Sequence, residues 1–220
     1  MALGLVTGSG DGGEIRPYIA FDAKAGRLFR VDRVQGLDGT YSAEKHEITE
    51  KAQFVADLAN IRVGWINYTS QGPVRRLVTL GKEAIPPRPE EKNSEGKPAF
   101  KQGFEIDLML NKDTGGGPAR VLGSSAACVI EAMDELHDTY SAAPEGKAGK
   151  LPVVRITSVL PVKSKQSTNY KPVFSIVSWV DRPAGLQANA NAQKPAAAPS
   201  TGATPVAPPA PQVASAFDFG

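Results

Sequence analysis

The chain has 220 residues, 41% of them hydrophobic and 22% charged, with a formal net charge of only +2. This length suits one large or two small domains, and its one cysteine, Cys128, excludes an internal disulfide and favours a reducing compartment. The sequence shows neither a signal peptide nor an apolar run approaching the roughly 20 residues of a membrane span, so we expect a cytoplasmic protein that does not bind membranes.

Residues 1–14 are rich in glycine, and we expect a flexible N-terminal segment there. Residues 15–21 and 27–33 then flank a turn at 22–26 that ends in glycine, a pattern that predicts a β-hairpin. A polar segment follows, as far as residue 53.

A longer β pattern occupies residues 54–81. Apolar and polar side chains alternate through 54–68 and again through 74–81, with a turn sequence between them, and this predicts a long hairpin. Gly64, inside its first arm, suggests a bulge or a close approach of two backbones. Several prolines within residues 81–101 predict an extended, solvated loop.

The next strand, residues 103–110, alternates so that its apolar side chains face inward and Glu105 and Asp107 face solvent. A glycine-rich connection at 111–118 leads to the only convincing helix, residues 126–141, which has an apolar stripe and an acidic face.

Two strands close the folded part, at residues 152–162 and 172–180, and a short basic loop joins them. From residue 183 to 220 alanine and proline dominate, which predicts a disordered tail. We therefore expect one domain over residues 15–182.

The order of these elements favours a mainly β fold. Strands followed by one late helix and two closing strands fit an OB-fold-like, partly open five-stranded barrel with the helix between strands 3 and 4. Residues 82–123 would then be an insertion that carries an extra strand. An α+β sandwich, with the helix on one face of a sheet, is the alternative.

The sequence gives little support for an enzyme, and we expect no catalytic residue, metal or cofactor. His46 and His137 are far apart and Cys128 is alone, so no zinc-ligand spacing exists. The glycines at 115–117 lack the lysine and hydroxyl residue of a phosphate-binding loop. Glu105 and Asp107 alternate on one strand face, where carboxylates are usually just solvated.

Single-stranded nucleic acid is a better match. Its binding needs cations along a groove and exposed rings on which bases stack. The predicted strands are basic, whereas the helix is acidic and would be repelled from a major groove. The expected phosphate contacts are Arg27, Arg30, Arg62, Arg75, Arg76, Lys163, Lys165 and Lys171, and the expected stacking residues are Tyr68 and Tyr170, with Tyr18 and Trp65 less favoured. Core packing is the preferred interpretation for Trp65 and Trp179.

The layout of the chain, and the block TNYKPVFSIVSWVDRP within residues 163–183, resemble single-stranded-DNA-binding proteins of bacterial and phage replication and recombination. The resemblance implies an OB-fold that coats single-stranded DNA without sequence preference, and a tail whose tip recruits replication or recombination proteins. Phe217, Asp218 and Phe219 occupy that tip. Family tails are rich in acids, whereas this tip carries Asp218 alone, so recruitment would depend on the two aromatic rings. A phage-encoded chain would act in the host cytoplasm.

A virion or assembly protein without nucleic-acid affinity is the alternative function. Its β body would pack against copies of itself, so a homo-oligomer is possible under either hypothesis.

Overall fold

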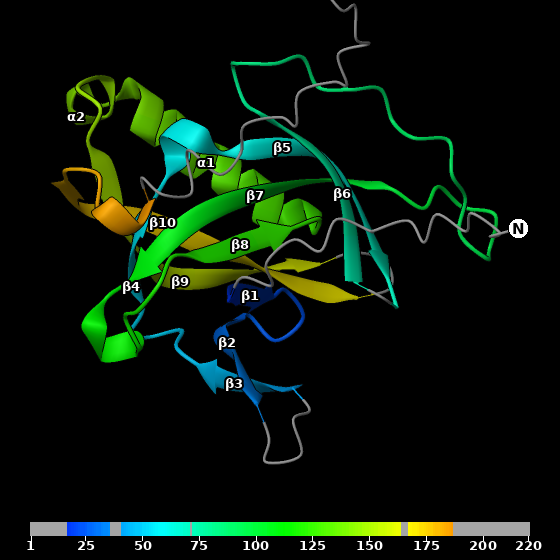
Figure 1. Cartoon of the computed structure of the whole chain (residues 1–220), viewed down its shortest axis with the longest axis horizontal. Coiled ribbons are helices and arrows are strands. Elements are labelled where there is room, and N and C mark those ends of the chain that lie inside the picture. Colours follow the sequence, from blue (N-terminus) through cyan, green and yellow to red (C-terminus); the bar gives the residue numbers. More distant parts are fainter. Residues whose placement is uncertain (1–16, 36–40, 71, 164–166, 187–220) are drawn as a thin grey trace, which may run out of the picture.

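The computed structural model describes residues 17–35, 41–70, 72–163 and 167–186 (Figure 1). The predicted N-terminal segment 1–14, Lys165 and most of the predicted tail, including Phe217, Asp218 and Phe219, lie outside these residues.

Strands dominate the described chain, which confirms the mainly β class. The elements in chain order are β1 (Tyr18–Asp22), β2 (Arg27–Gln35), β3 (Tyr41–Glu47), β4 (Gln53–Ala56), the 3-10 helix η1 (Leu58–Asn60), β5 (Arg62–Thr69), β6 (Gly72–Thr79), β7 (Lys101–Leu110), the 3-10 helix η2 (Lys112–Thr114), β8 (Arg120–Ser124), α1 (Ala127–Ala142), α2 (Pro144–Lys147), β9 (Leu151–Lys163) and β10 (Thr168–Val180).

The strands form one mixed, open sheet in the order β10-β9-β4-β7-β8-β1-β2-β3, and β5 and β6 branch from β7. All the strand pairs are antiparallel except β1 and β8, which run parallel. The sheet curls, and the Tyr170 backbone N–H at the start of β10 donates to the Ala23 carbonyl between β1 and β2, at 2.6 Å. The last strand therefore meets the first hairpin without forming a ladder with it.

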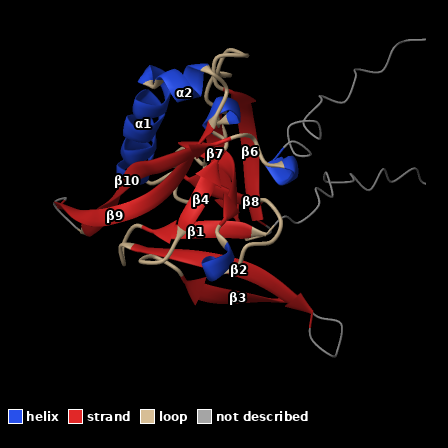
Figure 2. Ribbon diagram, turned by 90° about the vertical axis from the view of Figure 1, so that its left-hand side faces the viewer, coloured by secondary structure: helices blue, strands red, loops and turns tan. Residues whose placement is uncertain are grey.

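The hydrophobic core lies between the curled sheet and α1, which runs beside β10 (Figure 2). Helical spacing puts Val129, Met133 and Leu136 on one buried face of α1, as predicted. At the far end of the helix the Tyr140 ring packs against Trp179, with ring centroids 6.0 Å apart. Trp179 is thus partly buried and packs against the core, in agreement with the sequence interpretation.

Two sequence predictions about the middle of the chain are wrong. Residues 82–123 are not an insertion with one extra strand, because they supply β7 and β8, which lie in the middle of the sheet. Glu105 and Asp107 of β7 do not face open solvent, because they are only 6% and 8% exposed. The polar segment before residue 53 also contains a strand, β3, that the alternation rule missed.

The long hairpin is confirmed in part, as β5–β6. Its predicted first arm, residues 54–68, is not one strand, because β4 pairs with β7 and β9 and η1 separates it from β5. Gly64 is the close approach that the sequence predicted. At φ +151°, a Cβ on Gly64 would lie 2.3 Å from the Arg76 carbonyl oxygen of β6. Any other residue there would push the two strands apart, so this glycine is required by the pairing.

The folded body extends beyond the predicted boundary at residue 182. Arg182 makes two hydrogen bonds to the buried carboxylate of Asp57, which raise the pKa of the arginine. Leu186 is completely buried in a small cluster with Leu151 and Ala119. The folded body thus includes the described residues as far as Leu186.

Replacing Leu186 with alanine should therefore lower the free energy of unfolding by about 2–5 kcal/mol, the usual range for a buried leucine. Urea unfolding of the full chain measures the change. Leu160→Ala, at a strand position that is 51% exposed, is the matched control and should change stability little. Equal effects of the two changes would show that Leu186 is not part of the core.

Candidate nucleic-acid interface

The structure separates most of the predicted nucleic-acid residues into two groups. Arg62, Tyr68, Arg75 and Arg76 lie on the β5–β6 hairpin, whereas Arg27, Lys163, Tyr170 and Lys171 lie where the β9–β10 hairpin meets the β1–β2 turn. Figure 2 shows β6 and the free end of β9 on opposite sides of the molecule. The two groups therefore do not form one continuous groove.

Three members of the first group, Arg62, Tyr68 and Arg75, lie on one outer sheet face, formed by β5, β6, β7 and β8. Ile66 of β5 is opposite Arg75 of β6 and Lys101 of β7, so all three side chains point to the same face. Tyr68, two residues along β5, shares this face and is 57% exposed. Tyr18 of β1 pairs in parallel with Val121 of β8, so this second tyrosine, 40% exposed, lies at the β8 side of the same face.

Buried ion pairs hold this face together. Arg62 lies 3.2 Å from the Asp107 carboxylate and 3.5 Å from that of Glu105, and its side chain is only 12% exposed. Arg75 pairs with Glu105 through Nε, while its side chain stays 45% exposed. Arg62 is thus engaged by β7, whereas Arg75 keeps part of its guanidinium at the surface.

Arg76 points to the opposite face of the hairpin. Its guanidinium lies 5.9 Å from the centre of the Phe100 ring and 3.8 Å from the Glu91 carboxylate, and it is 55% exposed. Trp65, its cross-strand neighbour, is half-buried on that same face.

Most of the second group is engaged inside the molecule. Lys171 is 12% exposed and lies 2.6 Å from Glu135 and 3.0 Å from Glu131 of α1. These hydrogen bonds, to Glu135 first and then to Glu131, raise the pKa of Lys171. Lys171 thus ties the acidic helix to β10.

Tyr170 is half-buried rather than a free platform. Its ring carbons lie close to Gly26, where an added Cβ would come within 3.1 Å of them. Arg27 pairs with Glu47 at 2.8 Å, and Lys163 is exposed at the end of β9. This side of the molecule thus offers less free positive charge than the sequence predicted.

Arg30 lies apart from both groups, in a network that joins β2 to β8. Arg30 and Arg120 both pair with Asp32, at 2.7 and 2.5 Å. Burial alone would raise the pKa of Asp32, but the hydrogen bond and charge of Arg120, together with Arg30, hold it below the ordinary value of 3.8. Arg30 also donates to the Thr114 carbonyl at 2.9 Å, so its role is structural.

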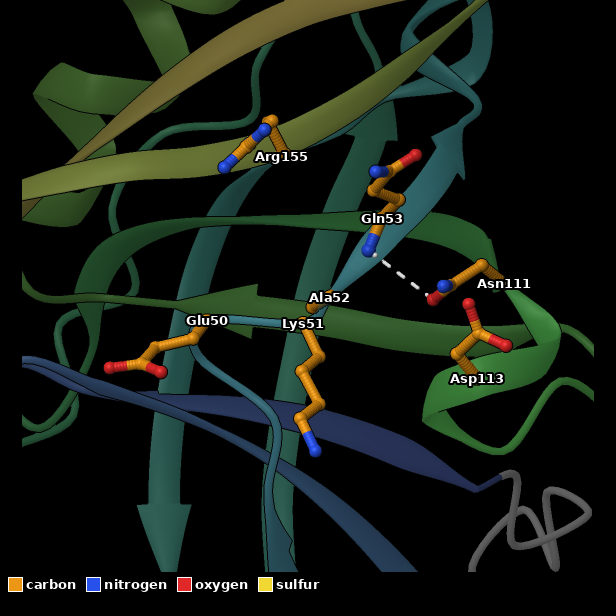
Figure 3. Close-up of a pocket in the computed structure, with 7 residues that line it drawn as sticks. All are labelled: Glu50, Lys51, Ala52, Gln53, Asn111, Asp113 and Arg155. Carbon is orange, nitrogen blue, oxygen red and sulfur yellow. Dashed lines mark hydrogen bonds between the residues drawn. The ribbon is translucent and has the colours of Figure 1, made fainter.

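A separate pocket of about 420 Å³ opens beside β4 (Figure 3). It is lined by Glu50, Lys51, Ala52, Gln53, Asn111, Asp113 and Arg155. The Gln53 backbone N–H donates to the Asn111 side-chain oxygen at 3.3 Å. Two cations and two carboxylates line the pocket, so its charges offset one another, and none of the predicted nucleic-acid residues lies there.

Among the described residues no cluster of three or more histidine, cysteine or acidic side chains could hold a metal ion. Within the same ranges no helix is long and apolar enough to cross a bilayer.

Sequence reasoning missed Lys101 as a member of the outer face. The signal was present, because Lys101 shares the alternation of Glu105 and Asp107 along β7. The sequence prediction places Lys101 in the preceding loop and the two carboxylates in solvent, and both differ from the structure.

Asp32→Asn should destabilise the protein by about 1–3 kcal/mol at neutral pH, since it removes the charge that Arg120 and Arg30 share. The pKa of Asp32 is lowered by folding, so its stabilisation is present above pH 4 and is lost as the pH falls through the lowered pKa. Urea unfolding at pH 7 and pH 3 should show a smaller difference between wild type and variant at the lower pH. Asp138→Asn, on the exposed face of α1, is the control, and a pH-independent difference for Asp32→Asn would contradict the role of its charge.

Comparisons of the chain with protein-family models, with curated proteins and with solved structures found no match. What the chain does must therefore be inferred from its own residues and their arrangement.

Proposed function

We propose that the chain binds single-stranded DNA, without sequence preference, across the outer face of β5, β6, β7 and β8. The observation that carries the proposal is the exposed ring of Tyr68 on the same face as the half-exposed Arg75 and the exposed Lys101. A ring on which a base can stack, beside cations that can contact phosphates, is what single-strand binding requires. Tyr18, across β8, offers a second ring at the far side of this face.

The strand arrangement supports the proposal. We infer an OB-type core in which β4 continues through η1 into β5 as the first strand, β7 and β8 are the second and third, and β9 and β10 are the last two. The helix α1 then falls between the third and fourth strands, as in OB-folds. In such folds nucleic acid crosses strands 2 and 3 next to the connection between strands 1 and 2. Here these elements are β7, β8 and the arm β6.

Charge distribution also favours a single strand over a duplex. The exposed carboxylates of α1 would repel DNA, so this helix is a poor reader of a major groove. On the proposed face, by contrast, the two carboxylates are buried and paired with arginines. Arg62 and Arg75 balance the charges of these two carboxylates, so Lys101 supplies the surplus positive charge of the face, and the exposed part of the Arg75 guanidinium can still donate to a phosphate.

Following the resemblance, we propose that the protein acts in replication or recombination, in a phage-infected cell, and that Phe217, Asp218 and Phe219 recruit partner proteins. Lys163 and Arg27, on the other side of the molecule, then contribute less than the sequence predicted.

Fluorescence anisotropy with a labelled oligo-dT tests the proposal. The full chain should bind the single strand more tightly than a duplex of equal length, and its affinity should fall steeply with salt because phosphate contacts release counterions. Tyr68→Ala should weaken binding by about 1–3 kcal/mol, the contribution of one stacked base.

A matched pair of charge reversals locates the site. Lys101→Glu and Lys163→Glu both change an exposed lysine at the end of a strand, but Lys101 lies on the outer face opposite Ile66, whereas Lys163 lies at the free end of β9. Lys101→Glu should weaken binding and Lys163→Glu should change it little. The reverse result would move the site to the β9–β10 hairpin, and stable oligomers without any affinity for single strands at low salt would favour the assembly protein instead.

A further inference from the structure

The loop between β6 and β7, which we call the strap (residues 81–100), lies over the face of the β5–β6 hairpin that carries Trp65 and Arg76. This face is opposite the outer face described above. Its proline-rich arm passes over Trp65, whose indole N–H donates to the Pro86 carbonyl at 2.8 Å. The Arg88 guanidinium lies 5.3 Å from the centre of the Trp65 ring and donates two hydrogen bonds to the Phe100 carbonyl. Phe100 is completely buried, so the end of the strap is fixed to the body.

Two strap groups occupy positions that suit parts of a nucleotide. Arg88 is a flat group over a tryptophan ring, where a base could stack. Glu91 is a carboxylate beside the guanidinium of Arg76, where a phosphate oxygen could lie. Trp65 and Arg76 are directly opposite each other on β5 and β6, so the two positions are adjacent.

The strap is bound weakly enough to be displaced. Most of its residues are exposed. Among the described residues, the segment 85–98 contacts the hairpin through the Trp65–Pro86 hydrogen bond, the Arg88–Trp65 contact and the Arg76–Glu91 ion pair alone. Both members of that ion pair are more than half exposed, and such pairs contribute little. A stacked base contributes more than an exposed cation–ring contact.

We infer that Trp65 and Arg76 form a second nucleotide subsite, which the strap occupies in the free protein and single-stranded DNA uncovers. This inference rests on the proposed function and adds to it a site on the other face of the same hairpin. A single strand bound at Tyr68 could pass around the edge strand β6 and displace Arg88 and Glu91. The strap thus lowers the affinity of the free protein by competing with DNA.

Two glutamates of the strap provide a matched test. Glu91→Gln replaces the carboxylate that pairs with Arg76 by a neutral amide. Glu95→Gln removes an equal charge, but in the described structure that charge pairs only with Lys97 of the strap itself. Glu91→Gln should raise the affinity of the full chain for labelled oligo-dT by about two- to fivefold, the range expected for one exposed ion pair. Glu95→Gln should leave it nearly unchanged, and equal effects of the two changes would overturn the inference.

Tryptophan emission gives an independent readout. Oligo-dT should quench the emission of the wild-type chain, and this quenching should disappear in Trp65→Phe, whose remaining Trp179 packs against Tyr140. If oligo-dT binds by anisotropy but the same quenching persists in Trp65→Phe, the subsite is wrong and the proposed function stands. If oligo-dT does not bind at all, the proposed function fails, and the subsite fails with it.

Discussion

The pairing of Glu105 and Asp107 with Arg62 and Arg75 is the interaction on which this molecule depends most. Both carboxylates lie on β7, which pairs with β4, β5 and β8 in the middle of the sheet. Buried charges are tolerated only when they are paired, and removing one member of such a pair typically costs about 3–5 kcal/mol. The arginines come from β5 and β6, so the ion pairs lock the hairpin against the central strand. The same contacts determine how much of Arg75 remains free at the surface.

Local patterns in the sequence predicted the elements well, because each depends on neighbours in the chain. The alternation in residues 62–79 and the helical spacing from Val129 to Tyr140 were both confirmed, although residues 54–60 belong to a separate strand and a 3-10 helix. The role of β7 could not be predicted, since it depends on pairing with strands distant in sequence. An alternating acid on a strand looks the same whether water or an arginine from another strand faces it. The alternation alone therefore predicts the wrong environment for Glu105, and the order of the elements predicts an insertion at residues 82–123 where the sheet has two central strands.

The candidate site was only partly predictable for a related reason. Basic and acidic residues are segregated along the sequence, but folding brings many of them together. Lys171 of the basic hairpin lies against Glu131 and Glu135 of the acidic helix. Arg30 likewise pairs with Asp32, and Arg62 pairs with Glu105 and Asp107. What remains exposed beside a ring is a smaller set, centred on Tyr68 and Arg75, and it includes Lys101, which the sequence argument had not selected.

The parallel pairing of β1 with β8 has a consequence for how the chain acquires this structure. Tyr18 is made well before Val121, with which it pairs. On a ribosome the first hairpin must therefore wait, with its apolar side exposed, until β7 and β8 have emerged. Contacts between such distant residues slow folding and prolong exposure of unpaired strands. Production of the protein should thus be more sensitive to chaperone supply than its stability after folding would suggest.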